Sequence, residues 1–155
     1  MCRTDYHIID RRVTYEVSLG GLLLVCGCAI YLLFRSRSLN IYQWCYALGW
    51  SKVIERLRII TQGWNVSDFI RYSLPDGLYC AAYILIVDAI WYNKYGPRKY
   101  AVILLVPTIA IGSELLQALN QIRGTFDVYD LVCYALPPLV YVCFITYHKF
   151  NNYKE

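Results

Sequence analysis

Three carboxylates come close together in the C-terminal half of the chain, just after a strongly apolar stretch. They belong to Glu114, Asp127 and Asp130. Carboxylates accept hydrogen bonds from hydroxyl and amine groups, and a pair of them can act as general acid and base. An ionised carboxylate in hydrocarbon costs at least about 2.5–3.5 kcal/mol, so an acid at membrane depth faces a partner, a cavity or water. We therefore expect binding or chemistry where these acids meet.

Glu114 is the acid that helix geometry explains least. Gln117 and Gln121 follow it at i+3 and i+7, which places all three on one face of a helix. Glu114 lies near the C-terminal end of that helix, where the dipole disfavours negative charge, so capping does not account for it. We expect it either to keep its proton in a hydrogen bond or to pair with Arg123 or Arg71.

A short turn separates Glu114 from the two aspartates. Gly124 can supply a positive φ there, so the helices on either side form a hairpin that brings their polar faces together. Asp127 is suited to cap the second of these helices, and Asp130 in its first turn is favoured by the helix dipole. Capping and ligand binding are compatible roles.

The elements that position these residues are long apolar blocks. Of the 155 residues, 58% are hydrophobic and 17% are charged, whereas soluble domains carry about 25% charged residues. A helix crosses a bilayer with roughly 20 apolar residues, and four blocks have about that length. We predict an all-α, polytopic membrane protein, with residues 1–155 as one membrane domain. Its bundle of four transmembrane helices has spans at about 17–34, 74–91, 100–118 and 128–147.

The long connection between the first two spans has a pattern of its own. From about 41 to 62, apolar residues recur near a helical period, with Lys and Arg interspersed. One interpretation is an amphipathic, cationic helix that lies at the membrane interface. The other is a helix packed on the surface of the bundle.

Four spans alternate sides of the membrane, so the start of the second, the end of the third and the start of the fourth share one face. Asp76 opens the second span in "SLPDG", where Ser73 is suited to be the N-cap and Asp76 to reach back. The predicted ligand-binding or polar network on this face consists of Asp76, Glu114, Gln117, Gln121, Arg123, Asp127 and Asp130. At the other end of the second span, Asp88 is expected to form an ion pair with Lys94, Arg98 or Lys99.

Charge and the remaining motifs narrow the function. The net charge of +4 comes mainly from connections between spans, where Lys and Arg anchor helix ends to headgroups, so we expect membrane lipids rather than nucleic acid as partners. The chain has no Ser/His or Cys/His nucleophile set and no zinc-type cysteine pairing, so neither a metal nor a cofactor is predicted. The short loop between the second and third spans carries three positive residues within Lys94–Lys99, whereas the loop between the third and fourth spans carries only Arg123. Positively charged loops tend to stay in the cytoplasm, so we expect both termini on the cytoplasmic side.

The pattern Glu114-x-x-Gln117, a short turn and Asp127-x-x-Asp130 resembles the VanZ-like family of small bacterial membrane proteins. The resemblance covers about residues 101–139. The resemblance implies that the protein resides in the inner membrane, as part of the cell envelope of a bacterium. It also implies a link to resistance against the glycopeptide teicoplanin, but it supplies no reaction. The family places Gly-Arg where this chain has Gly124-Thr125, and an Asn and a Gly where it has Tyr134 and Pro137.

Three functions fit these observations. The first is a non-enzymatic envelope protein whose acids and amides bind an amphiphile, such as a lipid-linked wall precursor or a glycopeptide antibiotic. The second is a membrane enzyme in which Glu114 with Asp127 or Asp130 forms an acid–base pair acting on a lipid or glycan headgroup. The third is a homo-oligomeric pore or membrane effector, since four short spans enclose little volume. Association with copies of itself or with another membrane protein stays open.

Overall fold

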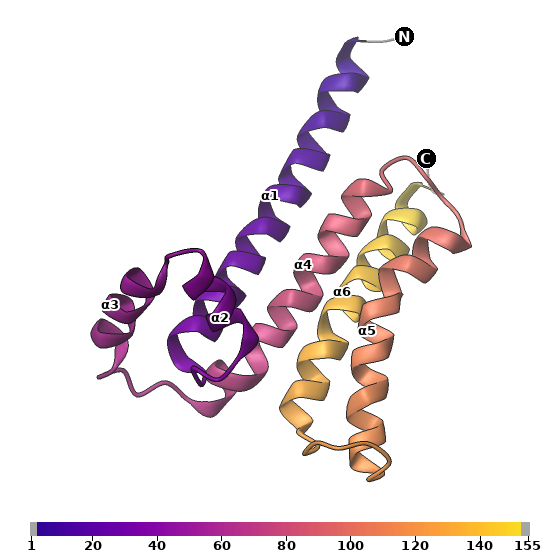
Figure 1. The fold of residues 1–155 in the computed structure, drawn as a ribbon. Helices are drawn as coiled ribbons and strands as arrows, with labels where there is room; N and C mark the ends of the chain where they lie inside the picture. The colour runs from indigo at the N-terminus through magenta and orange to yellow at the C-terminus, as the bar shows by residue number, and fades with distance from the viewer. Residues whose placement is uncertain (1–2, 153–155) are drawn as a thin grey trace.

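The part of the chain that the structure describes consists of helices joined by turns and loops. The structure is a computed structural model that describes residues 3–152, with side chains from 11 to 147. Its elements are α1 (Arg3–Phe34), α2 (Asn40–Ala47), α3 (Ser51–Thr61), the π-helical turn η1 (Phe69–Ser73), α4 (Leu74–Ile90), α5 (Pro97–Ala118) and α6 (Val128–Asn152) (Figure 1). Four of these helical segments are long and apolar enough to cross a membrane: 11–34, 69–90, 97–118 and 128–147. The predicted all-α architecture with four spans is therefore confirmed.

The bundle is organised around α4, which packs against α1, α5 and α6. Small residues let the backbones approach, as is common between membrane helices. A Cβ atom added at Gly77 of α4 would stand only 3.2 Å from Cβ of Cys133 in α6, and one added at Gly20 of α1 would stand 2.8 Å from the side chain of Ile86 in α4. The core between α4, α5 and α6 is apolar and centres on Cys80, Ile84 and Ile103.

The connection after α1 forms two helices rather than the single helix expected over 41–62. Gly49, at a φ of +79°, ends α2 and redirects the chain into α3. Tyr42, Cys45 and Ile54 form a small core that packs against Leu32 at the end of α1. The outer face of α3 leaves large apolar side chains exposed, namely Val53, Leu57, Ile59 and Ile60. The segment is thus packed on the bundle and still presents an apolar surface suited to a membrane interface.

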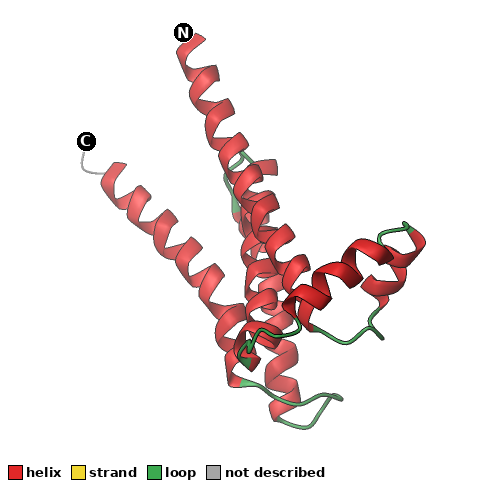
Figure 2. Cartoon of the chain, turned by 90° about the vertical axis from the view of Figure 1, so that its left-hand side faces the viewer, coloured by secondary structure: helices red, strands yellow, loops and turns green. Residues whose placement is uncertain are grey.

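The helices α1 and α6 diverge toward the chain termini (Figure 2). An apolar groove of about 700 Å³ lies between α1, α4 and α6, with Leu19, Leu85 and Val140 among its walls. The side chains of residues 1–10 and 148–155, at the two termini that we expect in the cytoplasm, lie outside the described part of the chain. The orientation in the membrane stays a prediction.

Candidate functional site

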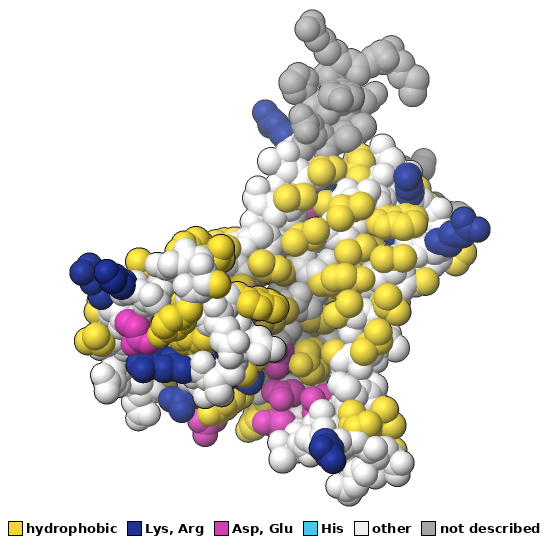
Figure 3. All heavy atoms as spheres, in the orientation of Figure 1, with side chains coloured by type: hydrophobic (Ala, Val, Ile, Leu, Met, Phe, Trp, Pro, Cys, Tyr) yellow, Lys and Arg dark blue, Asp and Glu magenta, His cyan; other side chains and the backbone are white. Residues whose placement is uncertain are grey.

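The structure brings carboxylates from three helix ends together at one end of the bundle. Asp76 lies in the first turn of α4, Glu114 near the end of α5, and Asp130 in the first turn of α6. Glu114 and Asp130 both lie within electrostatic range of Asp76, and Asp127 lies within range of Glu114. We call these four residues the acidic cluster. Figure 3 shows acidic side chains gathered at the foot of the bundle, between the α2–α3 lobe and the α5–α6 turn.

Glu114 is the most buried acid of the cluster, with 6% of its surface exposed. Its Oε2 accepts a hydrogen bond from the backbone N–H of Asp127 at 3.4 Å. This distance is longer than the usual 2.7–3.2 Å, so the bond is weak. None of the ion pairs among the described side chains includes Glu114. Of the two alternatives expected for Glu114, the structure therefore shows a hydrogen bond and not the ion pair with Arg123 or Arg71, and Arg123 is exposed in the hairpin turn.

The expected alignment of Gln121 with Glu114 is also wrong, because α5 ends too early. Asn120 has a φ of +55°, and the N–H groups of Asn120 and Gln121 donate to the carbonyls of Gln117 and Leu116. This is the Schellman pattern that closes a helix, so Gln121 lies beyond it. Its exposed amide donates only to the carbonyl of Leu119, at 3.5 Å.

Gln117 stays on the helix and packs against the turn. Gly124 has a φ of +146°, which confirms the expected need for glycine at this position. A Cβ atom there would lie 2.6 Å from the side-chain amide carbon of Gln117. The half-buried Gln117 amide therefore lies against the hairpin turn that connects Glu114 to Asp127.

The two predicted helix caps have different outcomes. Asp127 caps α6 as expected, because its Oδ1 accepts the backbone N–H of Tyr129 at 2.8 Å. Ser73 does not cap α4, since η1 continues the helical path before Leu74 and Ser73 makes no side-chain cap bond. The hydroxyl of Tyr134 from α6 lies beside Asp76 instead.

Tyr134 and Arg35 belong to this site and were missed in the sequence. Tyr134 follows Asp130 by four residues, a spacing that places both on one face of α6 and could have signalled the contact. Arg35, just after α1, is the cation within electrostatic range of Asp76. Its guanidinium donates to the carbonyls of Arg71 at 3.4 Å and Tyr72 at 3.0 Å, and stacks on Tyr31 and Tyr72. Nothing in the spacing of residues predicts that position.

Asp130 shows that the acidic cluster is short of hydrogen-bond donors. Its Oδ1 is buried and has no hydrogen-bond partner among the described residues. A buried acceptor left unpaired costs about 1–3 kcal/mol, more when it is charged. Within the described residues, the cluster sets four carboxylates against Arg35, the cation within electrostatic range of Asp76. Its chemistry therefore favours a ligand that brings N–H or O–H donors or a positive charge.

The acid at the opposite end of α4 is fully partnered and provides a contrast. Asp88 Oδ1 lies 2.7 Å from Lys99 Nζ and accepts the hydroxyl of Tyr141 at 2.6 Å, and Oδ2 lies 3.3 Å from Arg12 Nη2. The expected pair with Lys99 is confirmed, while the contribution of Arg12 from α1 was not foreseen. A cavity of about 590 Å³ adjoins these groups. Both oxygens of Asp88 are thus partnered, and they join α1, α4, α5 and α6, although Oε2 of the neighbouring Glu16 is buried without a hydrogen-bond partner among the described residues.

Comparison with known proteins assigns this chain to no family. No known protein family, curated protein or solved structure matches this chain. Within the described residues, no group of three His, Cys, Asp or Glu side chains is arranged to hold a metal ion. What the fold and site establish is a helical protein with four candidate transmembrane helices and a polar centre at one end of the bundle.

Proposed function

We propose that this protein is a VanZ-like component of the bacterial cell envelope that binds the polar part of an amphiphile at the acidic cluster. In this proposal it resides in the inner membrane with both termini in the cytoplasm. The observation that carries the proposal is the contrast between the two ends of α4: Asp88 is fully partnered, whereas Asp130 keeps a buried, unpaired oxygen beside Glu114 and Asp76. A carboxylate cluster that lacks donors inside the protein is suited to receive them from outside.

The chemistry of the cluster indicates the class of ligand. Carboxylates accept hydrogen bonds from hydroxyl, amide and ammonium groups, and bonds to a charged acceptor are worth about 1.5–3 kcal/mol each. Lipid-linked wall precursors and glycopeptide antibiotics carry such donors on an apolar anchor. The motif resemblance to VanZ-like proteins supports the same ligand classes, since it points to the envelope and to glycopeptides.

The acid–base alternative has less support from the geometry. Asp127 is engaged as the helix cap of α6 through its Oδ1, which leaves Glu114 and Asp130 as the pair available for catalysis. A pore through one chain is disfavoured by the packed apolar core. Cys80, Ile84 and Ile103 are buried between the polar groups at the two ends of α4, with exposed fractions of 3% or less.

The test is ligand binding by purified protein in lipid nanodiscs. We would titrate a fluorescent pyrophosphate-linked wall precursor, and separately teicoplanin, into the native protein and the Asp130→Asn and Glu114→Gln variants. Loss of one charge-assisted hydrogen bond predicts a ten- to hundredfold rise in Kd. Asp68→Asn is the matched control, because Asp68 is exposed and lies outside the cluster.

The result is readable only if the variants fold. Elution volume and thermal stability in detergent serve as that check. Unchanged affinity for both ligands in well-folded Asp130→Asn and Glu114→Gln would refute the proposal. Turnover of the precursor by the native protein, lost in Glu114→Gln, would replace it with the enzyme alternative.

A further inference from the structure

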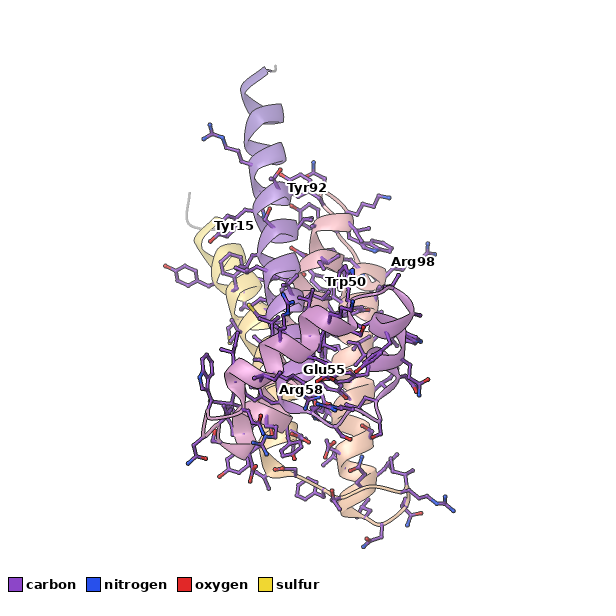
Figure 4. The ribbon with its side chains drawn as sticks, turned by 60° about the vertical axis from the view of Figure 1, so that its left-hand side comes forward. Tyr15, Trp50, Glu55, Arg58, Tyr92 and Arg98 are labelled. Atoms are coloured by element: carbon purple, nitrogen blue, oxygen red, sulfur yellow. The ribbon has the colours of Figure 1, made fainter. Side chains whose placement is uncertain are left out.

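A second polar site lies beside the acidic cluster, at the same end of the bundle. A cavity of about 340 Å³ opens between the end of α1, the helix α3 and the segment before α4. Its charged lining consists of Arg37, Arg58, Arg71 and Glu55, so three guanidinium groups face one carboxylate. We call this the arginine cavity. Figure 4 shows Glu55 and Arg58 next to one another on α3.

We propose that the arginine cavity binds the phosphate group of a membrane lipid. Guanidinium groups are planar, always charged and matched to phosphate oxygens in a two-point fork, so they are the usual residues for phosphate recognition. The proposal does not depend on the acidic cluster binding a ligand.

The hydrogen bonds of Arg58 leave its charge uncompensated. Its Nη1 donates to the hydroxyl of Tyr42, and its Nη2 donates to the carbonyl of Arg35 at 2.7 Å. The hydroxyl of Tyr42 in turn donates a hydrogen bond to the carbonyl of Leu32 near the end of α1. Burial raises the pKa of the Tyr42 phenol, so this partner stays neutral. Arg58 thus helps to close the C-terminal end of α1, and none of the ion pairs among the described side chains includes it.

Arg71 and Arg37 supply the groups that a ligand can use. The Nε of Arg71 is buried and has no partner among the described residues, although its guanidinium lies 5.9 Å from the ring centre of Tyr72. Arg37 pairs with Glu55 at 2.8 Å, but 65% of the Arg37 side chain is exposed. An exposed pair of this kind is worth about 0–1 kcal/mol, so an incoming phosphate can displace Glu55 from Arg37 or share Arg37 with it.

The walls of the cavity indicate that the phosphate belongs to a lipid. Leu33 and Phe34 end the membrane-spanning part of α1, and Ile59 comes from α3. Trp64, which is 62% exposed, lies at the rim as aromatic residues do at headgroup level. The arginines therefore lie where the phosphates of a bilayer are found, with apolar side chains beside them.

The experiment compares two lipids that differ in their phosphate headgroup. Purified protein in detergent is titrated with phosphatidylglycerol, with the matched diacylglycerol that lacks phosphate, and with inorganic phosphate, and retained lipid is measured by native mass spectrometry. We expect phosphatidylglycerol to bind at least tenfold more tightly than diacylglycerol. Arg71→Gln should remove most of that difference, and Arg71→Lys should restore only part of it, since a lysine keeps the charge but not the fork.

A matched control lies on the same helix as Arg58. Arg56 is exposed on α3 and does not line the cavity, so Arg56→Gln should leave binding unchanged. Equal affinity for the two lipids, or an equal loss in Arg56→Gln and Arg71→Gln, would overturn the proposal. Inorganic phosphate binding as tightly as phosphatidylglycerol would overturn the assignment to a lipid. Asp130→Asn should leave this binding intact, which separates the arginine cavity from the acidic cluster.

Discussion

Removing the Asp88 carboxylate should destabilise the bundle more than any change at its exposed partner Arg12. Asp88 holds Lys99 at 2.7 Å, and both side chains are buried, with 8% and 10% of their surfaces exposed. In Asp88→Asn the ammonium of Lys99 stays buried and loses its counter-charge. Tyr141 keeps an oxygen to donate to, because the amide of asparagine retains one.

The magnitudes separate the two charged partners of Asp88, Lys99 and Arg12. Breaking a buried ion pair by removing one member costs roughly 3–5 kcal/mol, because the other charge is left uncompensated. Arg12 is 52% exposed and lies 3.3 Å from Asp88, but it also pairs with Glu16 at 2.7 Å. Its loss should therefore cost about 1–2 kcal/mol, which includes the partner taken from Glu16 and is still less than the loss of Asp88. The double variant Asp88→Asn/Lys99→Met removes both buried charges and should recover most of the lost stability.

Reversible unfolding in mixed micelles with increasing dodecyl sulfate, followed by tryptophan fluorescence, measures these differences. The expected order of stability is native, Arg12→Gln, the double variant and then Asp88→Asn. The double-mutant cycle should give a coupling energy between Asp88 and Lys99 of about 2 kcal/mol or more. Equal losses in Asp88→Asn and Arg12→Gln, or additive losses in the double variant, would refute the view that Asp88 and Lys99 form a buried, mutually dependent pair.

Two glycine predictions can be made in the same assay. Gly77→Ala should lose about 1–3 kcal/mol, because its Cβ would meet Cβ and the backbone oxygen of Cys133 at 3.2 and 3.3 Å and push α4 from α6. Gly112→Ala is its control: it lies within α5 with open space around it, so it should be neutral or up to about 1 kcal/mol more stable. Gly124→Ala should lose about 1–3 kcal/mol, since it combines a φ of +146° with a Cβ position 2.6 Å from Gln117. Stability equal to that of the native protein in Gly77→Ala or Gly124→Ala would show that these close approaches do not constrain the packing.

The parts of the fold that depend on local pattern could be predicted from the sequence. Apolar blocks of membrane length identified the four spans. The cap at Asp127 and the turn at Gly124 followed from the chemistry of single residues. These features depend on neighbours in the chain, so one sequence carries enough information to place them.

The errors arose where a helix ended or where partners came from a distant element. Asn120 adopts a left-handed conformation that only some asparagines take, so the end of α5 before Gln121 was not evident. Gly49 similarly divides the interfacial segment into α2 and α3. Arg35 reaches the acidic cluster because α1 and α4 lie side by side, a packing that spacing within one helix does not reveal.

The two acids of α4 have a consequence for the thickness of the surrounding membrane. Asp76 and Asp88 are twelve residues apart in one helix, which corresponds to about 18 Å along its axis. The hydrocarbon layer of a typical bilayer is about 30 Å deep, which is more than the separation of the two carboxylates. When one carboxylate lies at one surface of this layer, the other therefore lies below the opposite surface. Asp88 can stay below the surface because Lys99, Arg12 and Tyr141 satisfy it. The acidic cluster is therefore the end at which lipids compress or water enters, and such mismatch biases a protein toward thinner membranes.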